Sequence, residues 1–150
     1  MRKLNSINNL RIPQSSKDVW AVISDIKSYP KWWPSSLKIK VVKSNENLIG
    51  SHIEIRPYGG IPFYCEFTEK FQNTKLVMKY TGIYSGFGEW RLTEINNQTE
   101  VVYEINLEIT NKFINALSKL LSLEKIHHNL MDKLLINLKQ RVGEVLKANE

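Results

Sequence analysis

The sequence predicts an α+β fold, in which a curved antiparallel sheet of about seven strands wraps around one long C-terminal helix. Three observations support this prediction. Apolar and polar residues alternate over residues 37–109, as they do in strands with one face in water. Apolar residues recur at helical spacing after residue 124. Between the first predicted strand and the alternating region, residues 15–33 carry the signals of two short helices.

The first predicted elements are a strand and a helix. Residues 4–12 have the weak alternation of a strand, and Pro13 ends it. Ser15 followed by Asp18 is a helix-start signature, because the serine side chain caps the first turn and an acid lies three residues further on. Apolar residues then recur at helical spacing, at Val19, Trp20, Ile23 and Ile26.

A second short helix and an aromatic loop are expected next. Asp25 is placed to cap this helix and Pro30 to end it. Prolines at both sides restrict the loop, residues 29–34. Because Trp32 and Trp33 are consecutive, an extended loop would point them to opposite sides, so that one seals the core or pocket and the other is more exposed. Either both rings pack, or the exposed ring is a membrane-interface anchor.

Six further strands are predicted between residues 37 and 109. Their inward-facing phase carries large apolar and aromatic side chains, while lysines and glutamates occupy the other phase. The inward phase includes Leu37, Ile39, Ile53, Ile55, Ile61, Phe63, Cys65, Phe67, Phe71, Met78, Tyr80, Trp90, Tyr103 and Ile105. Such a sheet must cover its apolar face, which favours packing against the C-terminal helix.

Two helices are predicted at the C-terminal end. Phe113, Leu117, Leu120 and Leu121 indicate a short amphipathic helix. A longer helix follows. Its sheet-facing positions recur at a spacing of three and four residues, at His127, Met131, Leu134, Leu138, Val142 and Val145. The long helix is the element large enough to cover the sheet. A bent sheet around one helix leaves space between them, which is a natural ligand site.

The charge pattern does not favour a nucleic-acid partner. The chain has 21 lysines and arginines against 15 acidic residues, a net charge of +6. These cations are scattered, and neither a block of like charges nor a phosphate-binding loop occurs. We therefore expect a solvated surface, no nucleic-acid binding, and at most a weak contact with anionic membrane surfaces.

Length and composition predict a single domain over residues 1–150, located in the cytoplasm. Chains of this length usually form one domain. The sequence has no run of ~20 apolar residues, which a membrane span needs, and polar residues follow Met1 where a signal peptide would be apolar. Cys65 is the single cysteine, which fits a reducing compartment. The oligomeric state does not follow from the sequence.

The histidines and the cysteine do not predict a metal site or a nucleophile. His127 and His128 are adjacent on a helix and point about 100° apart, so they do not readily chelate one metal together. We expect one to face the sheet and the other solvent, with a ligand-binding pocket histidine as the alternative. Cys65 lies in the inward phase, which favours a small buried hydrophobe. No metal and no cofactor are expected.

The carboxylates offer one unusual position. Glu54, Glu66 and Glu89 lie on the polar phase of their strands, whereas Glu69 shares the apolar phase. A β-bulge, or a side chain that reaches solvent, would explain why Glu69 lies on the apolar phase. The alternative is that Glu69 acts as a general base. No catalytic residue is assigned, and a role without catalysis is favoured.

Residues 15–33, SSKDVWAVISDIKSYPKWW, resemble the opening of the START-like, birch-pollen-allergen-like superfamily, also called SRPBCC or polyketide cyclase/dehydrase-like. GFGEWRL at residues 86–92, TEVVYEINLEI at 99–109 and the amphipathic segment 127–146 extend the resemblance over nearly the whole chain. It implies a helix-grip fold with a cavity. The second tryptophan, Trp33, departs from the pattern and adds bulk at the expected pocket entrance.

The resemblance and the inward aromatic residues together favour a protein that binds or carries a small, mostly hydrophobic ligand. A lipid, sterol, quinone or aromatic polyketide would suit an apolar chamber with a few hydroxyl and indole donors. The same rings also fit plain core packing. The expected ligand-binding residues are Trp32, Phe63, Phe67, Met78, Tyr80, Trp90, Tyr103, Met131 and Leu134.

Two alternatives come from other functional classes. The superfamily implies a polyketide cyclase or dehydratase-like enzyme, which would use pocket tyrosines or a histidine to polarise carbonyls and move protons. It also implies a partner-binding module that acts on a quinone enzyme or a ribosome. The absence of an evident inward acid–base pair places the enzyme second.

Overall fold

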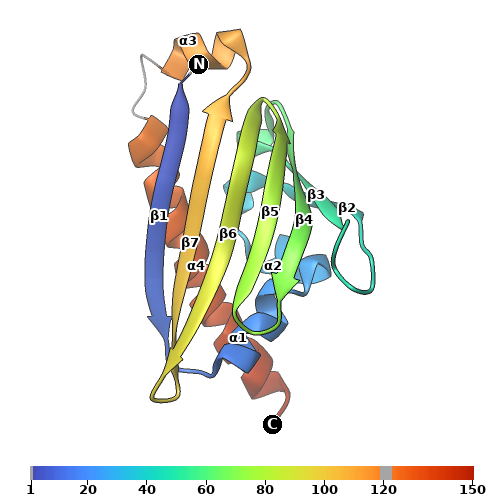
Figure 1. Cartoon of the computed structure of the whole chain (residues 1–150), viewed down its shortest axis with the longest axis vertical. Helices are drawn as coiled ribbons and strands as arrows, with labels where there is room; N and C mark the ends of the chain where they lie inside the picture. The colour runs from blue at the N-terminus through green and yellow to red at the C-terminus, as the bar shows by residue number, and fades with distance from the viewer. Residues whose placement is uncertain (1, 119–122) are drawn as a thin grey trace.

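The computed structural model describes residues 2–118 and 123–150, and within them the chain forms one antiparallel sheet with helices (Figure 1). The strand order is β1-β7-β6-β5-β4-β3-β2. The strands are β1 (Lys3–Ile12), β2 (Ile39–Lys43), β3 (His52–Ile55), β4 (Phe63–Phe71), β5 (Lys75–Gly82), β6 (Tyr84–Ile95) and β7 (Gln98–Ile109). The predicted α+β fold is confirmed.

Within the described residues, two α-helices lie between β1 and β2, and two more follow β7. The α-helices are α1 (Ser16–Ile23), α2 (Tyr29–Trp32), α3 (Lys112–Ser118) and α4 (Leu123–Ala148), and three short 3-10 turns are η1 (Ile26–Ser28), η2 (Ser35–Leu37) and η3 (Pro57–Gly59). Two positions of the predicted short helix, Leu120 and Leu121, lie outside the described residues. In the part of the chain that the structure describes, no helix is long and apolar enough to cross a bilayer.

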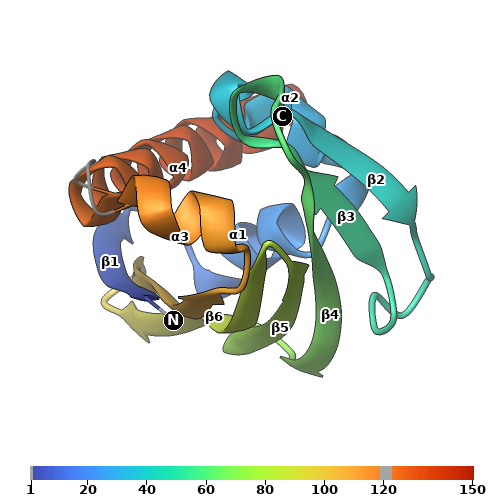
Figure 2. The ribbon, with the colours of Figure 1, turned by 90° about the horizontal axis from the view of Figure 1, so that it is seen from above.

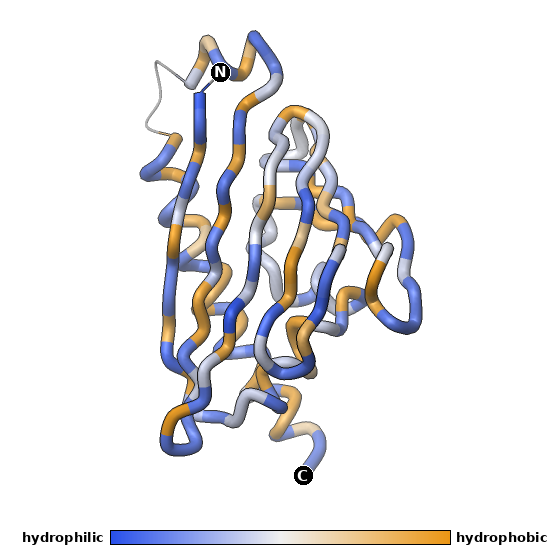
Figure 3. Tube along the Cα trace, in the orientation of Figure 1, coloured by the Kyte–Doolittle hydropathy of each residue, from blue (hydrophilic) through white to orange (hydrophobic). Residues whose placement is uncertain are grey.

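The sheet curls around α4, as the view from above shows (Figure 2). Apolar residues alternate along the strands, which puts one face of the sheet toward the helices (Figure 3). The buried side of α4 consists of Met131, Leu134, Leu135, Leu138 and Val142. Each such side chain contributes about 1.5–3 kcal/mol when it leaves water, so this stripe attaches the helix to the sheet.

The first helix begins as predicted. The backbone N–H of Asp18 donates to the side-chain oxygen of Ser15 at 3.2 Å, so Ser15 is the N-cap of α1. The prediction for Pro30 is wrong, because this residue lies in the first turn of α2 and does not end a helix. A proline has no N–H, and a first helical turn needs none there. Asp25 makes no side-chain cap bond.

Both tryptophans of the aromatic segment are buried. Trp32 is 5% exposed and Trp33 is 7% exposed, so the alternative in which both rings pack is confirmed and the alternative with one exposed ring is wrong. The chain forms the helical turn α2 here and not an extended loop, and both rings pack on Tyr29. Their centroids lie 5.3 Å and 5.0 Å from that of Tyr29. The side-chain amide of Asn137 donates to the carbonyl of Trp32 at 2.9 Å, which ties this turn to α4.

A β-bulge changes the alternation in β4. The register between β4 and β5 shifts between Phe67 and Glu69. One extra residue reverses the faces of all residues that follow it. Glu69 is therefore exposed, as the bulge interpretation predicted, and Phe71 is 52% exposed although its phase predicted an inward position.

Two glycines of β6 allow close contacts that position the aromatic residues of the sheet. Gly86 has φ +147°, and a Cβ atom there would lie 2.0 Å from the carbonyl oxygen of Asn106 on β7. A Cβ atom on Gly88 would lie 2.9 Å from the ring of Tyr80. The ring of Tyr80 thus lies against backbone that carries no side chain.

Gly86→Ala is expected to lower the free energy of unfolding by about 2–4 kcal/mol, because the strands must separate and the backbone is strained. Gly143→Ala is the matched control, since a Cβ atom at this helical position meets nothing within 4 Å. That change is expected to raise the free energy of unfolding by about 0.5–1 kcal/mol. Urea denaturation measures both, and equal effects would contradict the close approach of β6 to β7.

Candidate functional site

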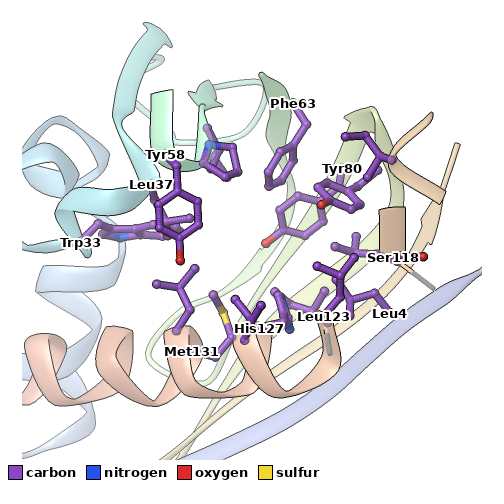
Figure 4. A pocket seen from close by; sticks show the side chains of 18 of the residues that line it. Leu4, Trp33, Leu37, Tyr58, Phe63, Tyr80, Ser118, Leu123, His127 and Met131 are labelled. Atoms are coloured by element: carbon purple, nitrogen blue, oxygen red, sulfur yellow. The ribbon is translucent and has the colours of Figure 1, made fainter. Parts of the chain in front are cut away.

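An internal cavity of ≈ 370 Å³ lies between the sheet and the N-terminal half of α4 (Figure 4). It is placed at the end of the molecule where α3 and η3 lie. The strands contribute Leu4, Ile55, Phe63, Tyr80, Tyr84, Tyr103, Ile105 and Leu107. Helices α3 and α4 contribute Ile114, Leu117, Ser118, Leu123, Ile126, His127, Leu130 and Met131. The segments between these elements contribute Trp33, Leu37, Pro57 and Tyr58.

The described lining contains no aspartate, glutamate, lysine or arginine. Its polar groups are tyrosine and serine hydroxyls, one indole and one imidazole. Ser118 uses its hydroxyl to donate to the carbonyl of Asn115 at 2.6 Å. The indole nitrogen of Trp33 is buried without a hydrogen-bond partner. The cavity is therefore an apolar chamber with a few neutral polar atoms on its walls.

Two tyrosines form a hydroxyl pair on the sheet wall. The hydroxyl oxygens of Tyr80 on β5 and Tyr103 on β7 are 2.5 Å apart. Only one of the two protons is needed for this bond, so the accepting tyrosine keeps its own proton to donate elsewhere. The ring of Tyr103 packs on Trp90, its partner in register, with centroids 4.2 Å apart. Packing thus holds the pair in place.

Burial keeps both hydroxyls protonated. It raises the pKa of Tyr80 well above its usual value, and the neighbouring Tyr103 adds to this effect. Burial also raises the pKa of Tyr103. A charged phenolate is poorly solvated in an apolar chamber. The pair therefore acts as a neutral hydrogen-bond donor and acceptor at ordinary pH.

His127 faces the cavity from α4, on the wall opposite Tyr80 (Figure 4). Burial, and then the neighbouring His128, lower the pKa of His127 to about 4. The ring is therefore neutral at pH 7, and its Nδ1 atom is buried without a hydrogen-bond partner. His128 points elsewhere, because its ring lies 3.2 Å from the side-chain amide of Asn8 on β1. His127 thus faces the sheet across the cavity while His128 is exposed, as expected, and a ligand contact of His127 stays a prediction.

The remaining candidates for chemistry lie outside the lining. Cys65 is buried next to Tyr80 in register, and burial raises the pKa of its thiol. A protonated, enclosed thiol is a poor nucleophile. Across residues 2–118 and 123–150, no three histidine, cysteine, aspartate or glutamate side chains converge to hold a metal ion.

The structure separates the nine expected ligand-binding residues into two groups. Phe63, Tyr80, Tyr103 and Met131 line the cavity. The other five are buried in the packed core and do not line it: Trp32, Phe67, Met78, Trp90 and Leu134. Alternation shows which face of the sheet a residue occupies, but it does not show how far along the strand the cavity extends. The cavity occupies one end only, and these five lie beyond it.

Other lining residues had no clear signal in the sequence. Tyr58 is in the turn η3 with φ +54°, where no strand or helix pattern predicts an inward ring. Trp33, by contrast, was expected at the pocket entrance, and it lines the cavity. The inward side of α3, which includes Ile114 and Leu117, follows from the amphipathic pattern once the helix is known to cover the cavity.

The sequence model of the family described as polyketide cyclase / dehydrase and lipid transport matches residues 10–143. The chain belongs to this family. The match includes the end of β1, the helix α1, the strands β2–β7 and most of α4. No curated protein matches the chain significantly. The family assignment confirms the resemblance found in residues 15–33, 86–92 and 99–109.

Solved structures of low sequence identity share the helix-grip fold of this polyketide cyclase-type chain. A START superfamily protein from Mycobacterium smegmatis is 11% identical, with TM-score 0.74 over 94% of this chain and 98% of that chain. The di-domain ARO/CYC StfQ of the steffimycin biosynthetic pathway is 13% identical, with TM-score 0.72 over 97% and 52%. Norcoclaurine synthase from Thalictrum flavum, in complex with dopamine and hydroxybenzaldehyde, is 10% identical, with TM-score 0.67 over 95% and 88%.

His127 generates a pH-dependent prediction. Its pKa is about 4 in the folded protein and about 6.5 when unfolded, so the unfolded chain binds more protons between these values. The stability is complete above pH 6.5 and is lost as the pH falls toward 4. Between pH 7 and pH 5 this residue should cost about 2 kcal/mol of unfolding free energy.

Urea denaturation of wild type and His127→Gln at both pH values measures this contribution. The wild type should lose about 2 kcal/mol more than the variant between pH 7 and pH 5, because the variant has no titrating ring in the cavity. An identical pH dependence in the two proteins would show that His127 is not held neutral by burial.

Proposed function

We propose that this protein binds or carries a small, neutral, mostly apolar molecule in the cavity between the sheet and α4. The observation that supports this best is an apolar chamber whose described lining holds no charged residue and in which burial keeps Tyr80, Tyr103 and His127 neutral. Binding would come from removal of apolar surface from water, about 25 cal/mol per Å². A charged ligand would lose its hydration without gaining a partner.

The cavity size favours a compact ligand. Its volume of ≈ 370 Å³ is near the lower limit for small-molecule pockets. The volume therefore favours an aromatic bicycle, a quinone ring or a short acyl group over a whole sterol.

The hydroxyl pair favours a ligand that carries a carbonyl or hydroxyl oxygen. The accepting tyrosine of Tyr80 and Tyr103 has a proton left to donate, and besides a ligand oxygen the buried thiol of Cys65 lies within hydrogen-bond reach of Tyr80. His127 on the opposite wall presents a neutral imidazole. A flat ligand with one oxygen at the sheet wall would meet the hydroxyl pair while its apolar body fills the chamber.

A cyclase-like reaction is the second candidate. The family description and two of the structural neighbours name cyclases or a synthase. Tyr80 and Tyr103 would polarise a substrate carbonyl, and His127 would accept a proton. However, a histidine with a pKa of about 4 is a weak base at neutral pH, which favours binding over catalysis. The buried free thiol of Cys65 supports a reducing, cytoplasmic setting for either role.

A matched pair of probes tests the proposal. Acetylnaphthalene and isopropylnaphthalene have the same number of non-hydrogen atoms, and they differ in the ketone oxygen. Wild type should bind the ketone about two- to tenfold more tightly, which corresponds to one hydrogen bond. The double variant Tyr80→Phe/Tyr103→Phe should bind both probes equally. Tryptophan quenching or calorimetry measures the affinities.

Two further variants complete this test. Tyr58→Phe is the matched control, because its hydroxyl is not part of the pair, and it should keep the preference for the ketone. Met131→Trp fills the chamber from α4 and should weaken both probes at least tenfold, provided that its circular dichroism shows a folded protein. If wild type binds neither probe, the proposed function is refuted.

A further inference from the structure

The mouth of the cavity is surrounded by exposed apolar side chains. We name this set the mouth rim; its members are the lining residues Tyr58, Leu117 and Ile126, together with Ile61 and Phe113, which are exposed apolar residues next to η3 and on α3. Three of them line the cavity and also face solvent, with exposures of 71% for Tyr58, 37% for Leu117 and 41% for Ile126. Phe113 on α3 is 67% exposed. The apolar interior therefore continues to the molecular surface at this end.

The rim differs from the other exposed apolar residues. Phe87 on the outer face of β6 and Ile136 on α4 are each 59% exposed, and single exposed residues of this kind are common. At the mouth, by contrast, three segments that are distant in sequence, η3, α3 and α4, each contribute an exposed apolar residue to the lining of one cavity. An apolar patch of this kind is typical of an interaction site.

Cations accompany the rim. Lys112 directly precedes Phe113, and Lys125 directly precedes Ile126; both lysines are exposed. The nearby carboxylate of Glu124 has a partner, because the guanidinium of Arg2 binds it at 2.5 Å. That hydrogen bond lowers the pKa of Glu124. The rim thus combines exposed apolar side chains with two exposed lysines, and the nearby Glu124 is already paired with Arg2.

The helices of the rim are held in a fixed orientation by Arg2. Its backbone N–H donates to the side chain of Asn115 on α3 at 3.1 Å, and its guanidinium donates to the carbonyl of Ser118 and to Glu124 on α4. In turn, the carbonyl of Arg2 accepts from Ile109 at the end of β7 at 2.9 Å. The rim therefore presents a preformed surface.

We propose that the mouth rim docks on the surface of an anionic lipid bilayer. Aromatic rings such as Tyr58 and Phe113 suit the headgroup level, and Lys112 and Lys125 meet anionic lipid there. The docking itself stands independently of the proposed function. Where a ligand occupies the cavity, it passes between bilayer and chamber through the mouth without crossing water.

Vesicle co-sedimentation tests the docking. Wild type should bind vesicles of equal parts phosphatidylcholine and phosphatidylglycerol, and binding should fall at high salt and with phosphatidylcholine alone. Phe113→Ser should weaken binding about tenfold, which is the value of burying one large apolar side chain. Lys112→Gln and Lys125→Gln should each weaken it about fivefold.

Matched controls distinguish vesicle binding through the rim from nonspecific adsorption of the protein. Phe87→Ser and Ile136→Ser remove exposed apolar residues of the same types away from the mouth and should leave vesicle binding unchanged, while Ile126→Ser should weaken it. Three results would overturn the proposal: no binding of wild type to anionic vesicles at low salt, equal losses in rim and control variants, or a lipid-free dimer in sedimentation velocity that Phe113→Ser dissociates. That last result would assign the rim to a second copy of the chain.

The probe titration distinguishes this proposal from the proposed function. Phe113→Ser should keep the affinity of wild type for acetylnaphthalene in solution within twofold, because Phe113 does not line the cavity. Vesicle binding without probe binding would refute the proposed function alone. Probe binding without vesicle binding would refute the docking alone.

Discussion

A strongly curved sheet and a straight helix cannot remain in contact along their whole length, and the rest of this structure depends on that misfit. From Met131 to Val142, α4 buries a continuous apolar stripe against the sheet. At its N-terminal end the surfaces diverge, and the side chains around His127 line a chamber of ≈ 370 Å³. Packing at one end therefore stabilises the fold, and the space at the other end is available for a ligand.

The chamber keeps its buried titratable groups neutral. Burial disfavours the imidazolium of His127 and the phenolates of Tyr80 and Tyr103, and it does so without any compensating charge in the described lining. The consequence is selectivity by exclusion, because a charged molecule finds no partner inside. The same neutrality makes the chamber a poor place for proton transfer. It is physically consistent with a binding role in a family whose description includes both cyclases and lipid transport.

The sequence predicted the elements better than it predicted the site. The cap at Ser15 and the alternation along the strands depend on local chemistry, and both were confirmed. The predicted inward position of Phe71 was wrong because one extra residue in a β-bulge reverses the faces of the residues after it. The predicted helix end at Pro30 was wrong because proline fits the first turn of a helix as well as the position after its end. The extent of the cavity depends on where sheet and helix diverge. Because this divergence depends on tertiary packing, no local sequence pattern predicts that Trp90 lies in the core and Tyr58 at the mouth of the cavity.

The central claim is that the chamber holds a small neutral molecule. Native mass spectrometry of the protein purified from its own host tests it most directly, with Met131→Trp purified in parallel as the protein with a filled chamber. The account predicts one bound neutral molecule per chain in wild type, compact enough for ≈ 370 Å³, and none in the variant. A bound molecule with a permanent charge, or one retained equally by Met131→Trp, would contradict the account.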